Sequence, residues 1–446
     1  MREHITPGAF HNSAERYDPP KCHPETCVAV IQEIIDWIQD GQRTSFIKWL
    51  NGPAGAGKSA IAQEIAEWCY KLGLLAASFF WSRNASGRNN ETWLITSLAY
   101  QLLLAFPQLR KHVEEAVETD PSLFNRSLEA QMESLIVEPL QKTFGHDQEE
   151  HLDTKVLILD GLDECGTPES QRYILKVISN SVHRFPIPLV FLISSRPEQA
   201  IRDSFNNHPL FPITVRLTLD EKYQPDDDIR LFLVESFESV KRTHTLRSHL
   251  PPVWPTDNDL DRLVRKSSGQ FIYAATVVNF VRASRRRPDE QLHIVLGITA
   301  ATNNTPFAEL DALYCQIFSV VEDLPRALDI LSCLFLVDEV GHYGTSIADI
   351  IETILSYTPG DIQLILIDLH SILHVPEFLD DDEDCYSVRP EANLRVLHAS
   401  LQDFLMDPSR SGKFHIDEGK AHASIAQHFL RYIRNCPDQS TCTLFC

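Results

Sequence analysis

The segment that most constrains the fold is Phe46–Ala60, where an apolar run meets a glycine-rich loop and then a helical pattern. The apolar run stops at Gly52, and Gly52-x-x-x-x-Gly57-Lys58-Ser59 follows with the spacing of a phosphate-binding P-loop. Glycine leaves the backbone free to fold tightly, so that successive N–H groups converge on an anion. The segment therefore predicts a strand, a loop and a helix, with a nucleotide bound at the loop.

The residues of the loop have separate predicted roles. The helix that begins near Lys58 directs its positive end to the same anion. Lys58 supplies a mobile charge for the β- and γ-phosphates, and the Ser59 hydroxyl is a candidate Mg²⁺ ligand. A glycine-rich surface turn is the alternative, but the strand before the loop and the helix after it argue against one. The predicted nucleotide-binding residues of this segment are Gly52, Pro53, Ala54, Gly55, Ala56, Gly57, Lys58, Ser59 and Ala60.

A second nucleotide motif lies at the end of the apolar segment Lys155–Asp160, which reads on into Gly-Leu-Asp163-Glu164. A hydrophobic strand ending in aspartate is the Walker-B arrangement, in which Asp160 would hold the Mg²⁺ that bridges the β- and γ-phosphates. Asp163 and Glu164 follow directly, where a carboxylate can orient or deprotonate the attacking water. Alone this pattern also fits a surface turn. Downstream of a P-loop it favours a catalytic site.

Arg196 lies immediately after a third apolar segment, Pro188–Ser195. A guanidinium at this position can reach the γ-phosphate and contribute charge to its hydrolysis. A salt bridge at the edge of a sheet is the alternative. Because parallel strands bring their carboxyl ends to one edge of a sheet, the phosphate role is favoured.

The order of the predicted elements indicates an α/β protein. Apolar strands alternate with helical patterns up to about residue 220, which predicts a P-loop NTPase parallel sheet with helices on both faces. The strand signal then nearly vanishes, and helical patterns predict an all-α domain. Two short strand-like pieces flank the acidic run Asp380–Asp384, and with the helices around them they suggest a winged-helix-like unit.

The predicted division of the chain follows from these patterns. It comprises an extended lead-in (1–24), a P-loop nucleotide-binding domain (25–220), a helical domain (221–340), and a winged-helix-like domain with a C-terminal helix (341–446).

Composition limits the partners and the compartment. The 446 residues carry a net charge of −22, from which we expect neither nucleic acid nor an anionic membrane as a partner, since both need a basic face. Ten cysteines are scattered without a regular framework, which favours reduced thiols in a cytoplasmic protein. Cys22, His23 and Cys27 allow part of a zinc site, but no second close pair follows. No run reaches the roughly 18 apolar residues of a membrane span.

The two nucleotide motifs and Ser194-Ser-Arg-Pro197 together resemble the NACHT group of signal-transduction ATPases. The likeness is strongest to fungal NLR-like proteins with a nephrocystin-3-like N-terminal domain, and it covers roughly residues 20 to 434. It implies three domains that close over ADP in the resting state. On that resemblance His398 matches the winged-helix histidine that contacts the β-phosphate. Relatives usually carry an N-terminal effector and C-terminal sensing repeats as well, for which we expect no room in this chain.

Three functions remain open from the sequence. The first is a switch in which ATP or GTP with Mg²⁺ favours an open, self-associating state and ADP or GDP favours a closed one, with slow hydrolysis and a part in signal transduction. Its signalling partners are not indicated. The second is a nucleotide-binding scaffold or decoy without turnover. The third is a small-molecule phosphotransferase, which needs an Arg-rich lid that is not evident between residues 82 and 155.

Overall fold

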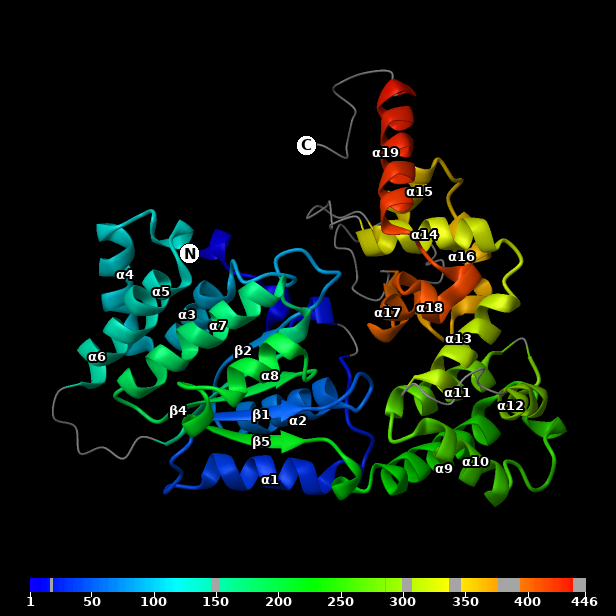
Figure 1. Ribbon diagram of the computed structural model, residues 1–446, viewed down its shortest axis with the longest axis horizontal. Helices are drawn as coiled ribbons and strands as arrows, with labels where there is room; N and C mark the ends of the chain where they lie inside the picture. The colour runs from blue at the N-terminus through cyan, green and yellow to red at the C-terminus, as the bar shows by residue number, and fades with distance from the viewer. Residues whose placement is uncertain are drawn as a thin grey trace. The chain divides into compact units, whose positions relative to one another are not determined.

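The chain forms two compact units, Met1–Gln224 and Pro225–Cys446, which are described separately below (Figure 1). The computed structural model describes residues 1–16, 19–145, 153–284, 286–298, 307–336, 346–375 and 394–435. The acidic run at 380–384 lies outside the described residues.

The first unit is built on a five-stranded sheet in which every pairing is parallel, in the order β2-β3-β4-β1-β5. The sequence also predicts strands at Leu74–Trp81 and Ile213–Leu219. With the three named above, all five predicted strands are present, and the predicted α/β fold class is confirmed. Because the sheet is parallel, the carboxyl ends of β3, β4 and β1 lie side by side at one edge. The strands are β1 (Ile47–Asn51), β2 (Leu75–Phe80), β3 (Lys155–Asp160), β4 (Leu189–Ser195) and β5 (Thr214–Thr218).

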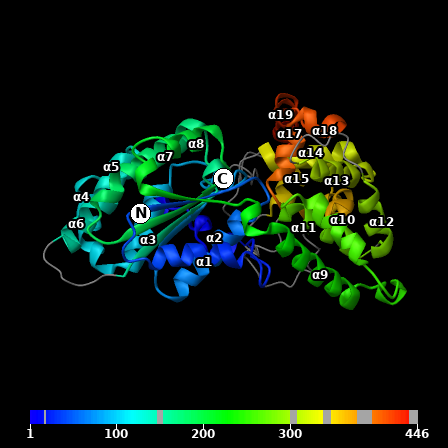
Figure 2. The same cartoon turned by 60° about the horizontal axis from the view of Figure 1, so that its bottom comes forward.

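Helices cover both faces of the sheet because the central strands are apolar on both sides (Figures 1 and 2). In β3, Val156 and Ile158 pack against α1 and α2, whereas Leu157 and Leu159 pack against the helices of the opposite face. This is the period of two that alternates side chains across a strand. The helices are α1 (Val28–Gln39) and α2 (Lys58–Lys71) on one face, and α3 (Leu94–Ala105), α4 (Arg110–Thr119), α5 (Leu128–Met132), α6 (Glu138–Phe144), α7 (Pro168–Ser181) and α8 (Gln199–Asn206) on the other.

Residues 1–16, here called the N-terminal strap, differ from the extended lead-in that the sequence suggests. They form three short 3-10 turns that are fastened to the first unit. The Thr6 N–H donates to Ser97 Oγ of α3 at 2.9 Å, and the His11 N–H donates to Ser78 Oγ of β2 at 3.0 Å. Side-chain acceptors on α3 and β2 thus satisfy two backbone N–H groups of the strap. The pattern of apolar residues in the strap does not indicate these hydrogen bonds.

The described residues of the second unit are helical apart from one two-stranded antiparallel ribbon, in which Leu373 pairs with Val396. One continuous hydrophobic core runs through it from Ile229 to Ile425. Its elements are α9 (Pro225–Thr243), α10 (Asp257–Ser267), α11 (Phe271–Arg282), α12 (Pro288–Gly297), α13 (Ala308–Ser319), α14 (Leu324–Leu336), α15 (Ile347–Leu355), α16 (Asp361–Ile365), β6 (Leu373–His374), β7 (Arg395–Val396), α17 (Ser400–Met406), α18 (Pro408–Ser411) and α19 (Glu418–Asn435). The helix–helix–ribbon–helix order from α15 to α17 is the one expected for a winged-helix-like unit.

Helix α10 starts with a complete capping box. The Asp259 N–H donates to Thr256 Oγ1 at 3.2 Å, and the Thr256 N–H donates to Asp259 Oδ2 at 3.0 Å. Both orphan donors at this helix end are therefore satisfied.

We expect Thr256→Ala to lower the free energy of unfolding of the second unit by about 1 kcal/mol, because one cap is lost. Thermal denaturation followed by far-UV circular dichroism measures the loss. Thr256→Ser keeps the hydroxyl and should cost little, and equal losses in the two variants would contradict the capping role.

Candidate nucleotide-binding site

The predicted P-loop connects β1 to α2 and turns sharply at two glycines. Gly55 has φ +75° and Gly57 has φ +90°, a region that other residues enter only with strain. Gly57 is the N-cap of α2, and within this described segment no side chain caps the helix. The first N–H groups of α2 therefore point to a place that suits an anion, next to the positive end of the helix.

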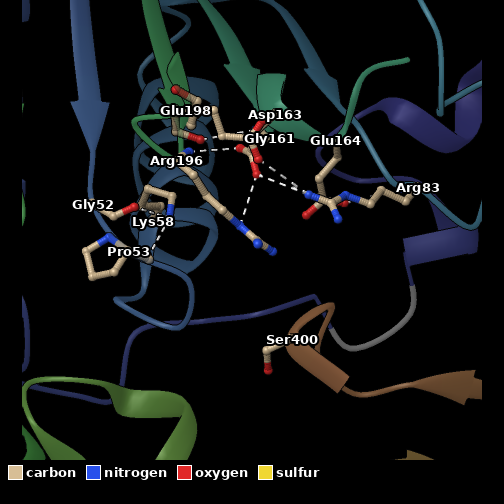
Figure 3. A network of polar contacts seen from close by, with 12 residues as sticks. Gly52, Pro53, Lys58, Arg83, Gly161, Asp163, Glu164, Arg196, Glu198 and Ser400 are labelled. Atoms are coloured by element: carbon tan, nitrogen blue, oxygen red, sulfur yellow. Dashed lines mark hydrogen bonds and ion pairs between the residues drawn. The ribbon is translucent and has the colours of Figure 1, made fainter. Parts of the chain in front are cut away.

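Lys58 lies folded back over its own loop (Figure 3). Its Nζ donates to the carbonyl oxygens of Gly52 at 2.9 Å and Pro53 at 2.8 Å. Burial lowers the pKa of Lys58, and the charge of Asp163 opposes that shift. A phosphate oxygen is a stronger partner for this ammonium than two carbonyls are, because a hydrogen bond between two ions is stronger than one to a neutral acceptor.

Asp160 ends β3 as a buried carboxylate, 4% exposed, with hydroxyl partners from two other elements. Ser194 Oγ of β4 donates to Asp160 Oδ1, and the Gly161 N–H donates to Ser194 Oγ at 3.2 Å. Burial raises the pKa of Asp160, whereas hydrogen bonds from the side chains of Ser194 and Ser59 lower it. The hydrogen bond with Ser59 joins the two residues that the sequence predicts as Mg²⁺ ligands.

This pair of oxygen ligands fits Mg²⁺. A hydroxyl and one carboxylate, completed by substrate phosphates and water, are a usual donor set for that ion. Throughout the described residues, no group of three or more His, Cys, Asp or Glu side chains is arranged to hold a metal ion. The pair offers one hydroxyl and one carboxylate, so phosphate and water oxygens would complete the ligands of a Mg²⁺ ion there.

Asp163 is the centre of an ion-pair network between the ends of β3 and β4 (Figure 3). Its side chain is 3% exposed and accepts the Arg196 N–H at 2.9 Å, and its other oxygen lies 3.1 Å from Arg196 Nε. Arg83, just beyond β2, brings Nη2 to 3.8 Å from the same carboxylate and to 3.9 Å from Glu198. The structure shows the salt bridge, one of the two alternatives for Arg196, directly after β4. The phosphate role stays a prediction.

Glu164 follows Asp163 and lies between that carboxylate and Arg83. Its Oε2 accepts the backbone N–H of Arg83 at 3.4 Å. Burial and the neighbouring charge of Asp163 raise the pKa of Glu164 to about 7, against the opposing charge of Arg83. A carboxylate that titrates near neutral pH is suited to accept a proton from water.

The network predicts a stability effect for Asp163→Asn. We expect the free energy of unfolding at pH 7.5 to fall by about 2 kcal/mol, because a charged acceptor is lost from two arginines. Urea denaturation measures the change. Glu198→Gln is the matched control at the exposed rim of the same network, and it should change stability by less than about 0.5 kcal/mol.

His398 belongs to the second unit, directly before α17. Its Nδ1 accepts the Ser400 N–H at 3.0 Å and lies 2.8 Å from Ser400 Oγ. These contacts give His398 a local role at the start of α17 and assign its proton to Nε2. The neutral ring can therefore donate a hydrogen bond through Nε2, which is what the predicted contact with a β-phosphate needs.

Sequence reasoning missed three residues of this region. Ser194 lies in the last two residues of β4, and Arg83 comes shortly after β2. Polar residues at the carboxyl ends of parallel strands are site candidates, the rule that identified Asp160 and Arg196, and it applies to both. Arg16 of the N-terminal strap interacts electrostatically with Asp160, since the charge of each shifts the pKa of the other. It follows no strand and belongs to no motif.

The sheet and the residues at its carboxyl edge define the class of domain to which the first unit belongs. A P-loop between β1 and α2, with an aspartate at the tip of β3 and β4 between the two strands, makes the first unit a P-loop NTPase domain.

Comparisons with known proteins give one family match and distant structural matches. The family model "Nephrocystin 3, N-terminal" matches residues 25–196, which is less than half of the chain. No curated protein matches the sequence. Among solved structures, Aeropyrum pernix ORC1 in complex with DNA is 17% identical with a TM-score of 0.35, and the match covers 77% of this chain and 83% of that one. Cdc6p from Pyrobaculum aerophilum is 12% identical with a TM-score of 0.37, and the match covers 83% and 92%.

The ORC1 match corrects one expectation. The net charge of −22 led us to exclude nucleic acid as a partner, but a matched protein is in complex with DNA. The exclusion is wrong as a deduction because net charge averages over all faces of a chain, whereas binding depends on one local surface. A TM-score of 0.35 is too low to argue that this chain itself binds DNA.

In the described part of the chain, no helix combines the length and the hydrophobicity that crossing a bilayer requires.

Proposed function

We propose that this chain is a nucleotide-operated switch of the NACHT class that binds ATP or GTP with Mg²⁺ and hydrolyses it slowly. The observation that carries the proposal is the meeting of three structures at the ends of neighbouring strands. These are the P-loop after β1, the hydrogen-bonded pair Asp160–Ser59, and the pair Asp163–Arg196. The domain division proposed from the sequence goes with it, with residues 25–220 as the nucleotide-binding part.

The residues have distinct proposed roles. The loop from Gly52 to Ala60 holds the phosphates through its N–H groups and Lys58. Ser59 and Asp160 would hold Mg²⁺, which when bound neutralises charge on the β- and γ-phosphates. Glu164 positions the attacking water and takes its proton, assisted by the neighbouring Asp163.

Arg196 is the proposed link between the phosphate and the switch. Its guanidinium pairs with Asp163 at 3.1 Å, and a γ-phosphate would compete for it. A ligand shifts a conformational equilibrium only by its difference in affinity for the two states, and about 5.5 kcal/mol moves a ratio of 1:99 to 99:1. Contacts of Lys58, Arg196 and His398 with different phosphates are the proposed source of this difference in affinity. In the resting state the bound nucleotide would be ADP or GDP.

A scaffold without turnover is the second candidate, and one observation favours it. A pKa of about 7 leaves much of Glu164 protonated at neutral pH, and a protonated carboxyl cannot accept a proton from water. Slow hydrolysis and none at all are therefore the two outcomes to separate.

The test uses the purified full chain with radiolabelled ATP and GTP. We expect retention of a purine nucleotide and phosphate release at about 10⁻⁴ to 10⁻² per second, as for other slow P-loop switches. The hydrodynamic radius with ADP and with a non-hydrolysable triphosphate is measured in parallel. Unchanged radius and no phosphate release would favour the scaffold, and no retained nucleotide would overturn both proposals.

A further inference from the structure

The N-terminal strap delivers an arginine to the face of the sheet that carries the P-loop helix. Arg16 Nη1 donates to Gln63 Oε1 of α2 at 2.8 Å and to the His11 carbonyl at 3.2 Å. The guanidinium carbon lies 3.6 Å from the centroid of the Phe80 ring. Gln63 Nε2 in turn donates to the same His11 carbonyl at 3.1 Å, so the strap and α2 hold Arg16 between them.

Gln63 and Phe80, the two neighbours of Arg16, are each adjacent to one residue of the proposed Mg²⁺ ligand pair. Gln63 is four residues after Ser59 on α2, and residues at this spacing lie on one face of a helix. Phe80 is the register partner of Asp160 in the β2–β3 pairing. The guanidinium is therefore anchored by one neighbour of Ser59 and one neighbour of Asp160, although 144 residues of sequence (160 − 16) separate it from Asp160.

Arg16 remains a cation in this place. Burial lowers its pKa to about 10, and the charge of Asp160 opposes that shift. In return the charge of Arg16 lowers the pKa of Asp160, against the effect of burial. At neutral pH a fixed positive charge thus acts on the carboxylate at the tip of β3.

We propose that Arg16 is a specificity-determining residue of the nucleotide site, whose charge favours Mg²⁺-triphosphate over Mg²⁺-diphosphate. The inference deepens the proposed function and rests on it. A triphosphate carries one more negative charge than a diphosphate. A fixed cation near the Mg²⁺ ligands therefore attracts the triphosphate more strongly. Because the strap supplies the cation, docking of the strap and binding of the triphosphate strengthen each other.

The test compares equilibrium dissociation constants of a non-hydrolysable Mg²⁺-triphosphate and of Mg²⁺-ADP, measured on the full chain by isothermal titration calorimetry. Arg16→Gln keeps a hydrogen-bonding side chain and removes the charge. We expect it to reduce the preference for the triphosphate about tenfold, the size of one unit charge acting at roughly 10 Å in a partly buried site. Arg16→Lys should retain most of the preference.

Ser97→Ala is the matched control, because it removes the acceptor of the Thr6 N–H and loosens the strap without altering its charge. Hydrogen exchange of residues 1–16 reports strap docking in each variant. We expect the triphosphate to slow this exchange more than ADP does in the wild type, and not in Arg16→Gln.

The possible results distinguish a failure of the Arg16 proposal from a failure of the proposed nucleotide switch. A preference unchanged within twofold in Arg16→Gln overturns the role of Arg16, whereas a partial loss in Ser97→Ala agrees with that role, because a loosened strap docks Arg16 less often. A wild-type chain that binds neither nucleotide overturns the proposed function itself.

Discussion

Replacement of Lys58 by alanine is expected to weaken the binding of ATP about a hundredfold and leave the fold intact. The ammonium now donates only to its own loop, to the carbonyls of Gly52 and Pro53, so the loop should keep its shape without it. With a nucleotide bound, the loss is that of charge-assisted hydrogen bonds to phosphate, worth about 2.7 kcal/mol or two factors of ten.

Titration with a fluorescent ATP analogue measures this loss, and circular dichroism checks the fold. Lys71→Ala is the control, since Lys71 is an exposed cation in the last turn of the same helix, α2. It should bind like the wild type. Affinity within about threefold of wild type in Lys58→Ala would show that the P-loop is not the binding site.

Replacement of Glu164 by glutamine is expected to slow hydrolysis about a hundredfold to ten-thousandfold, because the proton acceptor for water is lost. In the wild type the active form is the ionised carboxylate, whose pKa is about 7. The rate should therefore rise with pH, reach half its maximum near pH 7, and level off above it. Single-turnover hydrolysis of radiolabelled nucleotide between pH 5.5 and 9 tests the profile.

One further variant makes this pH profile diagnostic. Asp163→Asn removes the negative charge that raises the pKa of Glu164, so the half-maximum should move to lower pH. Equal rates in the wild type and Glu164→Gln would instead reject Glu164 as the base.

The same carboxyl predicts a pH-dependent gain in stability. The pKa of Glu164 is higher in the folded chain than its usual 4.5, so its contribution to stability is present below about pH 4.5 and is lost as the pH rises through about 7. Glu164→Gln should therefore be more stable than the wild type at pH 8, by about 1 to 2 kcal/mol after allowance for solvent at this partly exposed side chain, and nearly equal at pH 4.5. Urea denaturation at both pH values measures the difference.

The sequence predicted those parts of the fold that short stretches encode. The strands ending at Asp160 and Ser195 are apolar on both faces, so each is recognised from its own residues. The P-loop is recognised in the same way, because its glycines are needed for a local backbone shape. The start of helix α7 is also marked locally, since Thr167 caps it and Pro168 begins it.

The candidate site was predictable only where its residues follow strands. Asp160, Asp163, Glu164 and Arg196 obey that rule, and the structure places Asp163 against Arg196. Their roles in binding and hydrolysis remain predictions. Arg83 also comes shortly after a strand, β2, but it lies outside the two nucleotide motifs of the sequence.

What the sequence by itself determined is a P-loop on a buried parallel strand, since tight turns and double-sided apolar strands are local properties of neighbouring residues. Only the tertiary structure decided that β4 lies between β1 and β3, which brings Ser194 to Asp160. It also decided that the N-terminal strap holds Arg16 against Gln63 and Phe80, where its charge lowers the pKa of Asp160. The physical reason is that strand order and strap docking depend on contacts between residues far apart in the chain, and no local pattern of polarity records those contacts.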